Sequence, residues 1–147
     1  MNVIRALSLE IGPPCERGHG GGPGGWVFLF ETEVRLGETY VPDLAGWKKE
    51  RFPARTETNW ISVAPDRVCE VLSPSTALRD RTRKKELYAQ ARVGHLWLID
   101  PHNPTVEVYR LGSDAFEPAG VYGGKAKCRL EPFPEIEIDL ESFWLDG

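Results

Sequence analysis

The sequence predicts a mixed α/β (α+β) fold in which few helices flank a central mixed β-sheet. Three observations support this prediction. Several short segments are apolar or alternating, as in strands, one longer segment is amphipathic, as in a helix, and strand-like segments return after it. The chain has 147 residues, 41% of them hydrophobic, which suits a single domain, residues 1–147, with one core.

The N-terminal part, residues 1–25, predicts one short helix followed by a glycine-rich loop. In residues 1–11, Ile4, Leu7 and Ile11 fall on one side of a helix. Residues 12–25 contain so many glycines and prolines that we expect a surface loop without a regular element. This loop lacks the Gly-Lys-Ser/Thr signature and opens into a strand, which argues against a phosphate-binding P-loop.

The strand-like segments are of two kinds. Continuous apolar runs predict buried strands, and alternation of apolar with polar residues predicts a strand with one buried face. The apolar runs are residues 26–30, 67–72 and 94–100, and the alternating segments are residues 105–111 and 136–140. Elsewhere we expect a polar strand or turn at residues 31–36, a surface loop or hairpin tip at 48–65, a loop at 114–127 and a short strand at 128–130.

Asp43 lies in an apolar segment, residues 39–47, that Pro42 interrupts. A proline confines such a segment to a sheet edge, a bulge or the start of a strand, so Asp43 is expected where a strand bends or begins. Pro-Asp is also a common turn pair. On the local sequence alone, a turn residue is the favoured interpretation of Asp43.

A second carboxylate, Glu70, interrupts the apolar run at residues 67–72. Glutamate is costly to bury without a partner, so this position needs an explanation. The helix predicted to follow offers one, because its narrow apolar stripe has Lys84 at its centre. Asp80 lies one turn before Lys84 on that stripe and Tyr88 one turn after it. We therefore expect Lys84 and Asp80 to meet Glu70 at the sheet.

Asp43, Glu70 and Lys84 together have the chemistry of a metal-dependent hydrolytic site. Two converging carboxylates repel each other unless a cation lies near them. Oxygen ligands without histidine or thiolate suit Mg²⁺ or Mn²⁺, which polarise a phosphodiester and lower the pKa of bound water. A lysine beside the metal can orient that water or stabilise charge in the transition state. The alternative, that Glu70 and Lys84 are a buried ion pair holding the helix on the sheet, has equal weight on physical grounds.

Charge is distributed unevenly along the chain, whose net charge is −4. Residues 48–92 contain 11 of the 18 basic and 6 of the 22 acidic residues, a local charge of +5 that leaves −9 elsewhere. This asymmetry is compatible with a phosphate-facing surface, although a solvated helix face is the simpler interpretation. We expect Arg81, Arg83 and Lys85 to face solvent. The candidates for contact with nucleic acid are Lys48, Lys49, Arg81 and Lys85.

The sequence predicts a cytoplasmic protein with no membrane segment. No apolar run approaches the roughly 20 residues that a membrane span needs. The first residues lack the apolar core and cleavage site of a secretory signal. Three widely spaced cysteines without a CxxC pattern favour a reducing compartment, and three scattered histidines give little support to a zinc site.

Five segments, in this order, resemble the Uma-two family of endonucleases, a bacterial branch of the PD-(D/E)XK nuclease superfamily. They are VPDLAGW, CEVLSPST, DRTRKKELY, VGHLWLIDP and VEVYRL. The resemblance implies a restriction-endonuclease-like core with Mg²⁺-dependent hydrolysis of DNA as its activity. It implies that Asp43 and Glu70 are metal ligands. Lys84 would replace the lysine that the superfamily pattern places on the strand, where this chain has Leu72.

The N-terminal region is short for this family, in which a longer helical segment contributes an acidic residue. We expect Glu10, Glu31 or Glu33 to substitute for it, or the chain to be a truncated and inactive member. Glu33 is therefore a candidate supporting residue. Asp80 and Tyr88, which share the helix stripe with Lys84, are candidate supporting residues as well. The alternative function is a catalytically inactive nuclease-fold module that binds nucleic acid or a protein partner. With either function, a sheet with apolar edges favours a homodimer.

Overall fold

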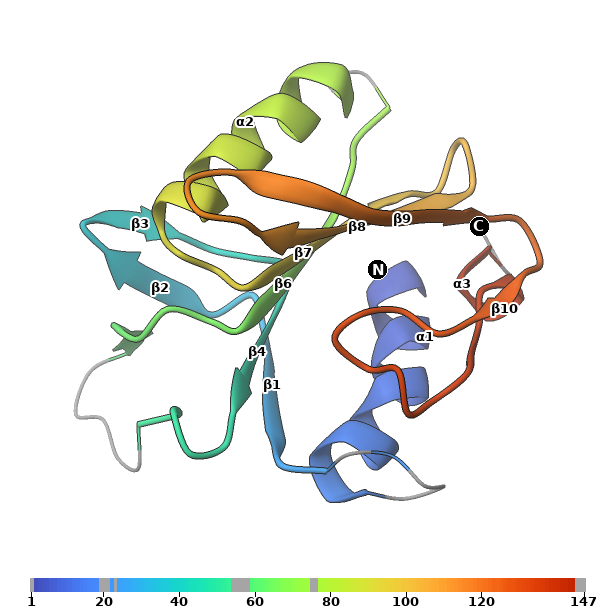
Figure 1. Cartoon of the computed structure of the whole chain (residues 1–147), viewed down its shortest axis with the longest axis horizontal. Helices are drawn as coiled ribbons and strands as arrows, with labels where there is room; N and C mark the ends of the chain where they lie inside the picture. The colour runs from blue at the N-terminus through green and yellow to red at the C-terminus, as the bar shows by residue number, and fades with distance from the viewer. Residues whose placement is uncertain (1, 19–21, 23, 54–58, 75–76, 145–147) are drawn as a thin grey trace.

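A six-stranded mixed β-sheet forms the centre of the molecule (Figure 1). The computed structural model describes residues 2–18, 22, 24–53, 59–74 and 77–144. The strand order is β1-β4-β6-β7-β8-β9, with bounds β1 Trp26–Phe30, β4 Leu44–Lys48, β6 Arg67–Val71, β7 His95–Asp100, β8 Thr105–Leu111 and β9 Phe116–Gly123. Strands β6 and β7 are parallel and the other neighbours are antiparallel. The mixed-sheet fold predicted from the sequence is confirmed.

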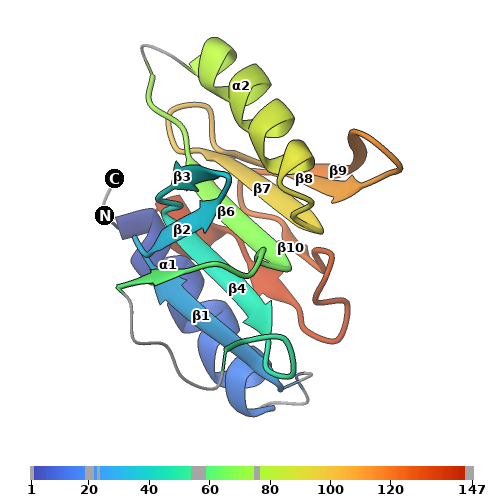
Figure 2. The same ribbon diagram turned by 90° about the vertical axis from the view of Figure 1, so that its left-hand side faces the viewer.

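Both faces of the sheet are covered (Figures 1 and 2). Helix α2 and a small three-stranded sheet of order β3-β2-β5 pack on one face. Helix α1 and the C-terminal segment pack on the other. The bounds of these elements are α1 Asn2–Ile11, η1 Gly12–Glu16, β2 Glu33–Leu36, β3 Glu38–Tyr40, β5 Trp60–Ile61, α2 Ala77–Gln90, β10 Lys127–Cys128, β11 Ile138–Asp139 and α3 Glu141–Trp144.

Alternation along the strands directs side chains into two hydrophobic cores. On β6, Val68 joins the core under α2, and Cys69 joins the core under α1. Glu70 has the parity of Val68 and therefore faces α2. On β8, Val106 belongs to the α1 side and Tyr109 to the α2 side. The strand carrying Glu70 is thus buried on both faces.

The strand register brings one row of side chains beneath α2. Glu70 of β6 is paired with Leu98 of β7, and Leu98 is paired in turn with Glu107 of β8. Directly opposite residues share a face of the sheet, so both glutamates face the helix, with a leucine between them. This row determines which charges α2 must meet.

Two segments predicted to be irregular are regular. Residues 116–123 form β9, an edge strand with no fully buried residue that pairs with β8 and lacks the apolar alternation of a buried strand. Residues 12–16 form a π-helical turn, η1, whose prolines lie in its first turn, where a missing N–H is tolerated. Residues 19–21 and 23 of the predicted glycine loop, and residues 54–58 of the predicted surface loop, lie outside the described residues.

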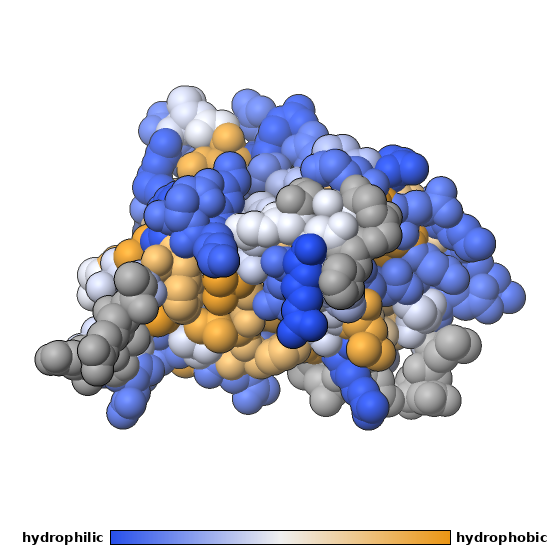
Figure 3. Space-filling view, turned by 90° about the horizontal axis from the view of Figure 1, so that it is seen from below, coloured by the Kyte–Doolittle hydropathy of each residue, from blue (hydrophilic) through white to orange (hydrophobic). Residues whose placement is uncertain are grey.

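Other elements lie close to their predicted bounds. Residues 31–36, predicted as a polar strand or turn, contain strand β2. Asp43 immediately precedes β4, so the prediction that it marks the start of a strand is confirmed. Where the chain is described, no helix has the length and apolar character needed to span a membrane. Seen from below, the molecule presents a band of apolar residues between hydrophilic margins (Figure 3).

Candidate active site

Glu70 contacts both side chains of α2 that lie above it. The residue is 4% exposed. The Lys84 ammonium nitrogen is 3.2 Å from Glu70 Oε2, and the Tyr88 hydroxyl donates to Oε1 at 2.5 Å. Lys84 and Tyr88 are four residues apart and so lie on one face of the helix. The contact between Lys84 and Glu70 expected from helical phase is present.

The environment of Glu70 raises the pKa of its carboxyl from 4.5 to about 7. Burial is the main cause, because it penalises the charged form. The charge of Lys84 and the Tyr88 hydrogen bond oppose this shift, and the nearby charge of Asp43 adds to it. Glu70 is therefore a carboxylate whose ionised form would be stabilised by a further cation.

Asp43 lies across from Glu70 on the neighbouring strand. Leu44 of β4 is paired with Cys69 of β6 in antiparallel register, and extending that register by one residue places Asp43 opposite Glu70. Asp43 Oδ2 accepts a hydrogen bond from the backbone N–H of Val71 at 2.8 Å. The register thus brings Asp43 opposite Glu70, close enough for its charge to act on the Glu70 carboxyl.

The two carboxylates fit a hard divalent cation. Asp43 and Glu70 together offer two carboxylates to a metal ion, and among the described residues no group of three or more His, Cys, Asp and Glu side chains is placed to hold one. Mg²⁺ is commonly bound by one or two carboxylates and completes its coordination with water and phosphate oxygens. The donor set therefore suits a hard divalent cation such as Mg²⁺ or Mn²⁺.

The structure separates the three acidic residues that could substitute for the family's N-terminal carboxylate. Glu10 accepts a hydrogen bond from the Ser142 hydroxyl at 3.3 Å, near the C-terminal segment. Glu33 forms an ion pair with Arg35. Glu31 lines the same pocket as Asp43, and its backbone N–H donates to the Asp43 carbonyl at 3.3 Å. Of the three, Glu31 is the residue placed beside Asp43.

Two predicted nucleic-acid contacts lie away from this site. Lys48 and Lys49 are exposed at the far end of β4, whereas Asp43 precedes its first residue. At 3.3 Å per residue, the five-residue strand separates them by roughly 16 Å. A role for Lys48 and Lys49 in binding would therefore concern DNA beyond the carboxylates.

Asp80, a candidate supporting residue, is half-buried in the first turn of α2.

The prediction that Arg81 faces solvent is wrong. Its Nε lies 2.8 Å from Oε2 and 3.0 Å from Oε1 of Glu107, and its side chain is 24% exposed. Arg81 is three residues before Lys84 and therefore shares the inward face of the helix. The Tyr109 hydroxyl donates to Glu107 Oε1 at 2.6 Å, and Lys85 lies 4.8 Å from the Tyr109 ring centroid. Arg81 is thus engaged with the sheet.

The sequence interpretation missed Glu107. Its alternation with Val106 and Val108 is typical of a strand with one solvated face, yet α2 covers that face. The signal that could have revealed Glu107 was the three-residue spacing of Arg81 and Lys84. This spacing places both cations on the inward face of the helix, so a second acceptor is expected beneath it.

Comparison with known proteins agrees with this fold. A family model, Uma2, described as "Putative restriction endonuclease", matches residues 3–141. None of the curated proteins matches the chain significantly. A solved structure titled as a "putative nuclease belonging to DUF820" from Anabaena variabilis ATCC 29413 is similar in fold, with a TM-score of 0.68 and 22% identity over 96% of this chain and 75% of that one. The resemblance found in the sequence is confirmed, and the chain belongs to the Uma2 family.

Proposed function

We propose that this protein is a Mg²⁺-dependent endonuclease that hydrolyses phosphodiester bonds in DNA. The observation that carries the proposal is the placement of Asp43 opposite Glu70, one residue beyond the paired part of β4 and β6, with Lys84 beside Glu70. The description of the family as restriction endonucleases supports the reaction class. An ion pair that merely held α2 on the sheet would not need the second carboxylate.

In this proposal, each side chain has a separate task. Asp43 and Glu70 would hold Mg²⁺ or Mn²⁺, and the ion, when bound, would polarise the phosphodiester and lower the pKa of a water molecule. The Val71 N–H and the Tyr88 hydroxyl each fix one carboxylate oxygen. These hydrogen bonds orient the carboxylates before any ligand arrives, which favours binding of a cation.

Lys84 would stabilise the negative charge that develops on the phosphate. Its side chain is 26% exposed, so the ammonium group can be reached by a substrate while it remains 3.2 Å from Glu70. An ammonium donor held in place stabilises the charge of a transition state without reorganising first. The position of this lysine on a helix, rather than on the strand, is compatible with that task.

The proposal is tested by incubating supercoiled plasmid with the protein and Mg²⁺ or Mn²⁺. We expect nicking that requires the metal and falls about 100- to 1000-fold in Asp43→Asn. Glu107→Gln is the matched control, because Glu107 faces the same helix but belongs to the other ion pair. Calorimetry should show Mn²⁺ binding to the wild type and not to Asp43→Asn. Absence of both cleavage and Mn²⁺ binding would leave the inactive binding module, whose DNA affinity Asp43→Asn should not reduce.

We also propose that the protein is cytoplasmic and forms a homodimer. Its three cysteines are free thiols, as expected in a reducing compartment. The edge strands β1 and β9 and the apolar band in Figure 3 offer surfaces for self-association. Light scattering coupled to gel filtration tests the dimer, and a mass equal to one chain over a wide concentration range would contradict it.

A further inference from the structure

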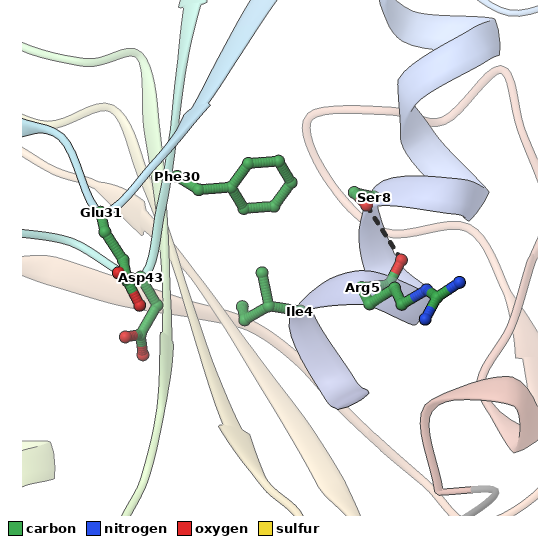
Figure 4. A pocket seen from close by; sticks show the side chains of 6 residues that line it. All are labelled: Ile4, Arg5, Ser8, Phe30, Glu31 and Asp43. Atoms are coloured by element: carbon green, nitrogen blue, oxygen red, sulfur yellow. Dashed lines mark hydrogen bonds between the residues drawn. The ribbon is translucent and has the colours of Figure 1, made fainter. Parts of the chain in front are cut away.

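A pocket of about 380 Å³ opens beside Asp43, between α1 and the end of β1 (Figure 4). Its lining residues are Ile4, Arg5, Ser8, Phe30, Glu31 and Asp43. The Phe30 ring and the Ile4 side chain project into the space between sheet and helix (Figure 4). The Arg5 guanidinium and the carboxylates of Glu31 and Asp43 point away from the ring. The pocket therefore has an apolar interior, and Asp43 of the candidate metal site stands at its edge with its carboxylate turned away from that interior.

Phe30 differs from the other aromatic residues of its strand. Trp26 and Phe28, on the same face of β1, each form an edge contact with Phe133, with ring centroids 5.0 Å and 6.0 Å apart. Phe30 is 51% exposed, and no ring contact involves it in the described part of the chain. The last aromatic ring of this row thus remains available at the pocket.

A second pocket, of about 370 Å³, continues this space along β1. It shares Ser8 and Phe30 with the first pocket and extends to Phe28 and Arg17. We call the two pockets together the α1–β1 groove. The groove runs from Asp43 along β1 to Glu16 and Arg17, which are both exposed.

The chemistry of the pocket defines the ligand it suits. The Phe30 ring and the Ile4 side chain give the pocket an apolar interior, which suits a flat, neutral ring and disfavours an anion. The phosphate joined to that ring would lie at the rim, where a metal ion held by Asp43 would neutralise it. A nucleobase with its phosphate combines these two properties.

We propose that the pocket binds one unpaired base of the DNA strand next to the scissile phosphate, stacked on Phe30. This inference rests on the proposed nuclease function, which it deepens by naming the substrate class. A base that remains paired and stacked in a duplex cannot enter between Phe30 and Ile4, so the strand must be single or the nucleotide turned out of the helix. The protein therefore acts on single-stranded DNA or on DNA with an unpaired nucleotide.

The test measures binding of fluorescein-labelled oligothymidylate and of an abasic strand of equal length, with Mn²⁺ present. Lys84→Met serves as the background, so that the strands are not cut during the measurement. We expect oligothymidylate to bind more tightly than the abasic strand. Adding Phe30→Ala should weaken binding of oligothymidylate roughly 5- to 150-fold, the range measured for loss of one stacked base, and leave the abasic strand unaffected. Phe30→Trp should retain the affinity.

Leu9→Ala is the matched control, because Leu9 is 69% exposed on α1 and belongs to neither lining. Equal binding of the two strands, or equal weakening of both by Phe30→Ala, would overturn the inference. Tighter binding of a fully paired duplex than of the single strand would do the same. Single-strand cleavage that depends on Asp43 but not on Phe30 would refute base binding in the pocket and leave the proposed nuclease function standing. Base-dependent binding without any metal-dependent cleavage would support the pocket and refute the nuclease function.

Discussion

Two glutamates beneath α2 are met by the same kinds of side chain but have different surroundings. Glu70 receives Lys84 at 3.2 Å and the Tyr88 hydroxyl at 2.5 Å. Glu107, two strands away in the same row, receives a guanidinium at 2.8 Å and a tyrosine hydroxyl at 2.6 Å. We call these the Glu70 cluster (Glu70, Lys84, Tyr88) and the Glu107 cluster (Glu107, Arg81, Tyr109).

The clusters differ in the charges that lie close to each glutamate. In the Glu107 cluster, the Arg81 Nε approaches both carboxylate oxygens, and the Tyr109 hydroxyl donates to one of them. In the Glu70 cluster, Lys84 and the Tyr88 hydroxyl each approach one oxygen, and Asp43 adds a second negative charge. The structural role considered for Glu70 and Lys84 is thus fulfilled by Glu107 and Arg81, and the neighbouring carboxylate sets the Glu70 cluster apart as a candidate site.

The largest expected difference is in the response of DNA cleavage to loss of each helix cation. Lys84→Met should lower the single-turnover cleavage rate about 100- to 1000-fold, because the developing charge loses its donor. Arg81→Met should lower it less than about tenfold. Both variants should lose about 1–3 kcal/mol of stability, since each leaves a largely buried carboxylate without its cation. Urea unfolding measures the stability, and equal loss of cleavage in both variants would contradict the distinction between the clusters.

The next effect is the dependence of stability on pH. The pKa of Glu70 is about 7 in the folded protein and 4.5 without its surroundings. Between these values the folded state holds the proton more strongly, so the contribution of Glu70 to stability is greatest below about pH 4.5. It declines as the pH rises through 7. The expected loss between pH 5.5 and 8 is roughly 2 kcal/mol.

The measurement is urea unfolding at both pH values with a chelator present. Glu70→Gln should abolish this part of the pH dependence because its side chain cannot ionise. Glu107→Gln, the control from the other cluster, should retain it. A wild-type protein whose stability does not fall over this range would show that the surroundings of Glu70 do not favour its protonated form.

The smallest effects come from the two tyrosine hydroxyls. Tyr88→Phe and Tyr109→Phe should each cost about 0.5–1.5 kcal/mol, the usual net value of a hydrogen bond. Since the Tyr88 hydroxyl lowers the pKa of Glu70, its removal should move the pH midpoint of Mn²⁺ binding upward. Tyr109→Phe should leave that midpoint unchanged. Calorimetric titration with Mn²⁺ between pH 5.5 and 8.5 compares the two, and identical midpoints would remove Tyr88 from the site.

The sequence predicted the contact between Lys84 and Glu70 because the helical period alone fixes which side chains share a face. It also predicted the strands that are continuously apolar. Strand β9 was not predicted because an exposed edge strand has little reason to alternate, and its residues include Pro118 and Gly120, which are uncommon in strands. Local sequence patterns therefore predict an element where burial imposes a period on its apolar residues.

The rest of the candidate site depends on distances between segments that no local pattern encodes. The choice among Glu10, Glu31 and Glu33 required the course of the chain from β1 into β2 and its hydrogen bond to Asp43. The partner of Arg81 required knowledge that α2 lies over β8 as well as β6. These are tertiary facts, set by how the sheet is assembled.

The two ion pairs of α2 also bear on how the molecule opens. Arg81 and Lys84 are one helical turn apart, yet their acceptors belong to β8 and β6, on either side of β7. The two ion pairs therefore connect the middle of the helix to two strands that lie on either side of a third. We expect such a helix to exchange its amide hydrogens together with the strands beneath it, and its interior to belong to the slowest-opening unit of the protein.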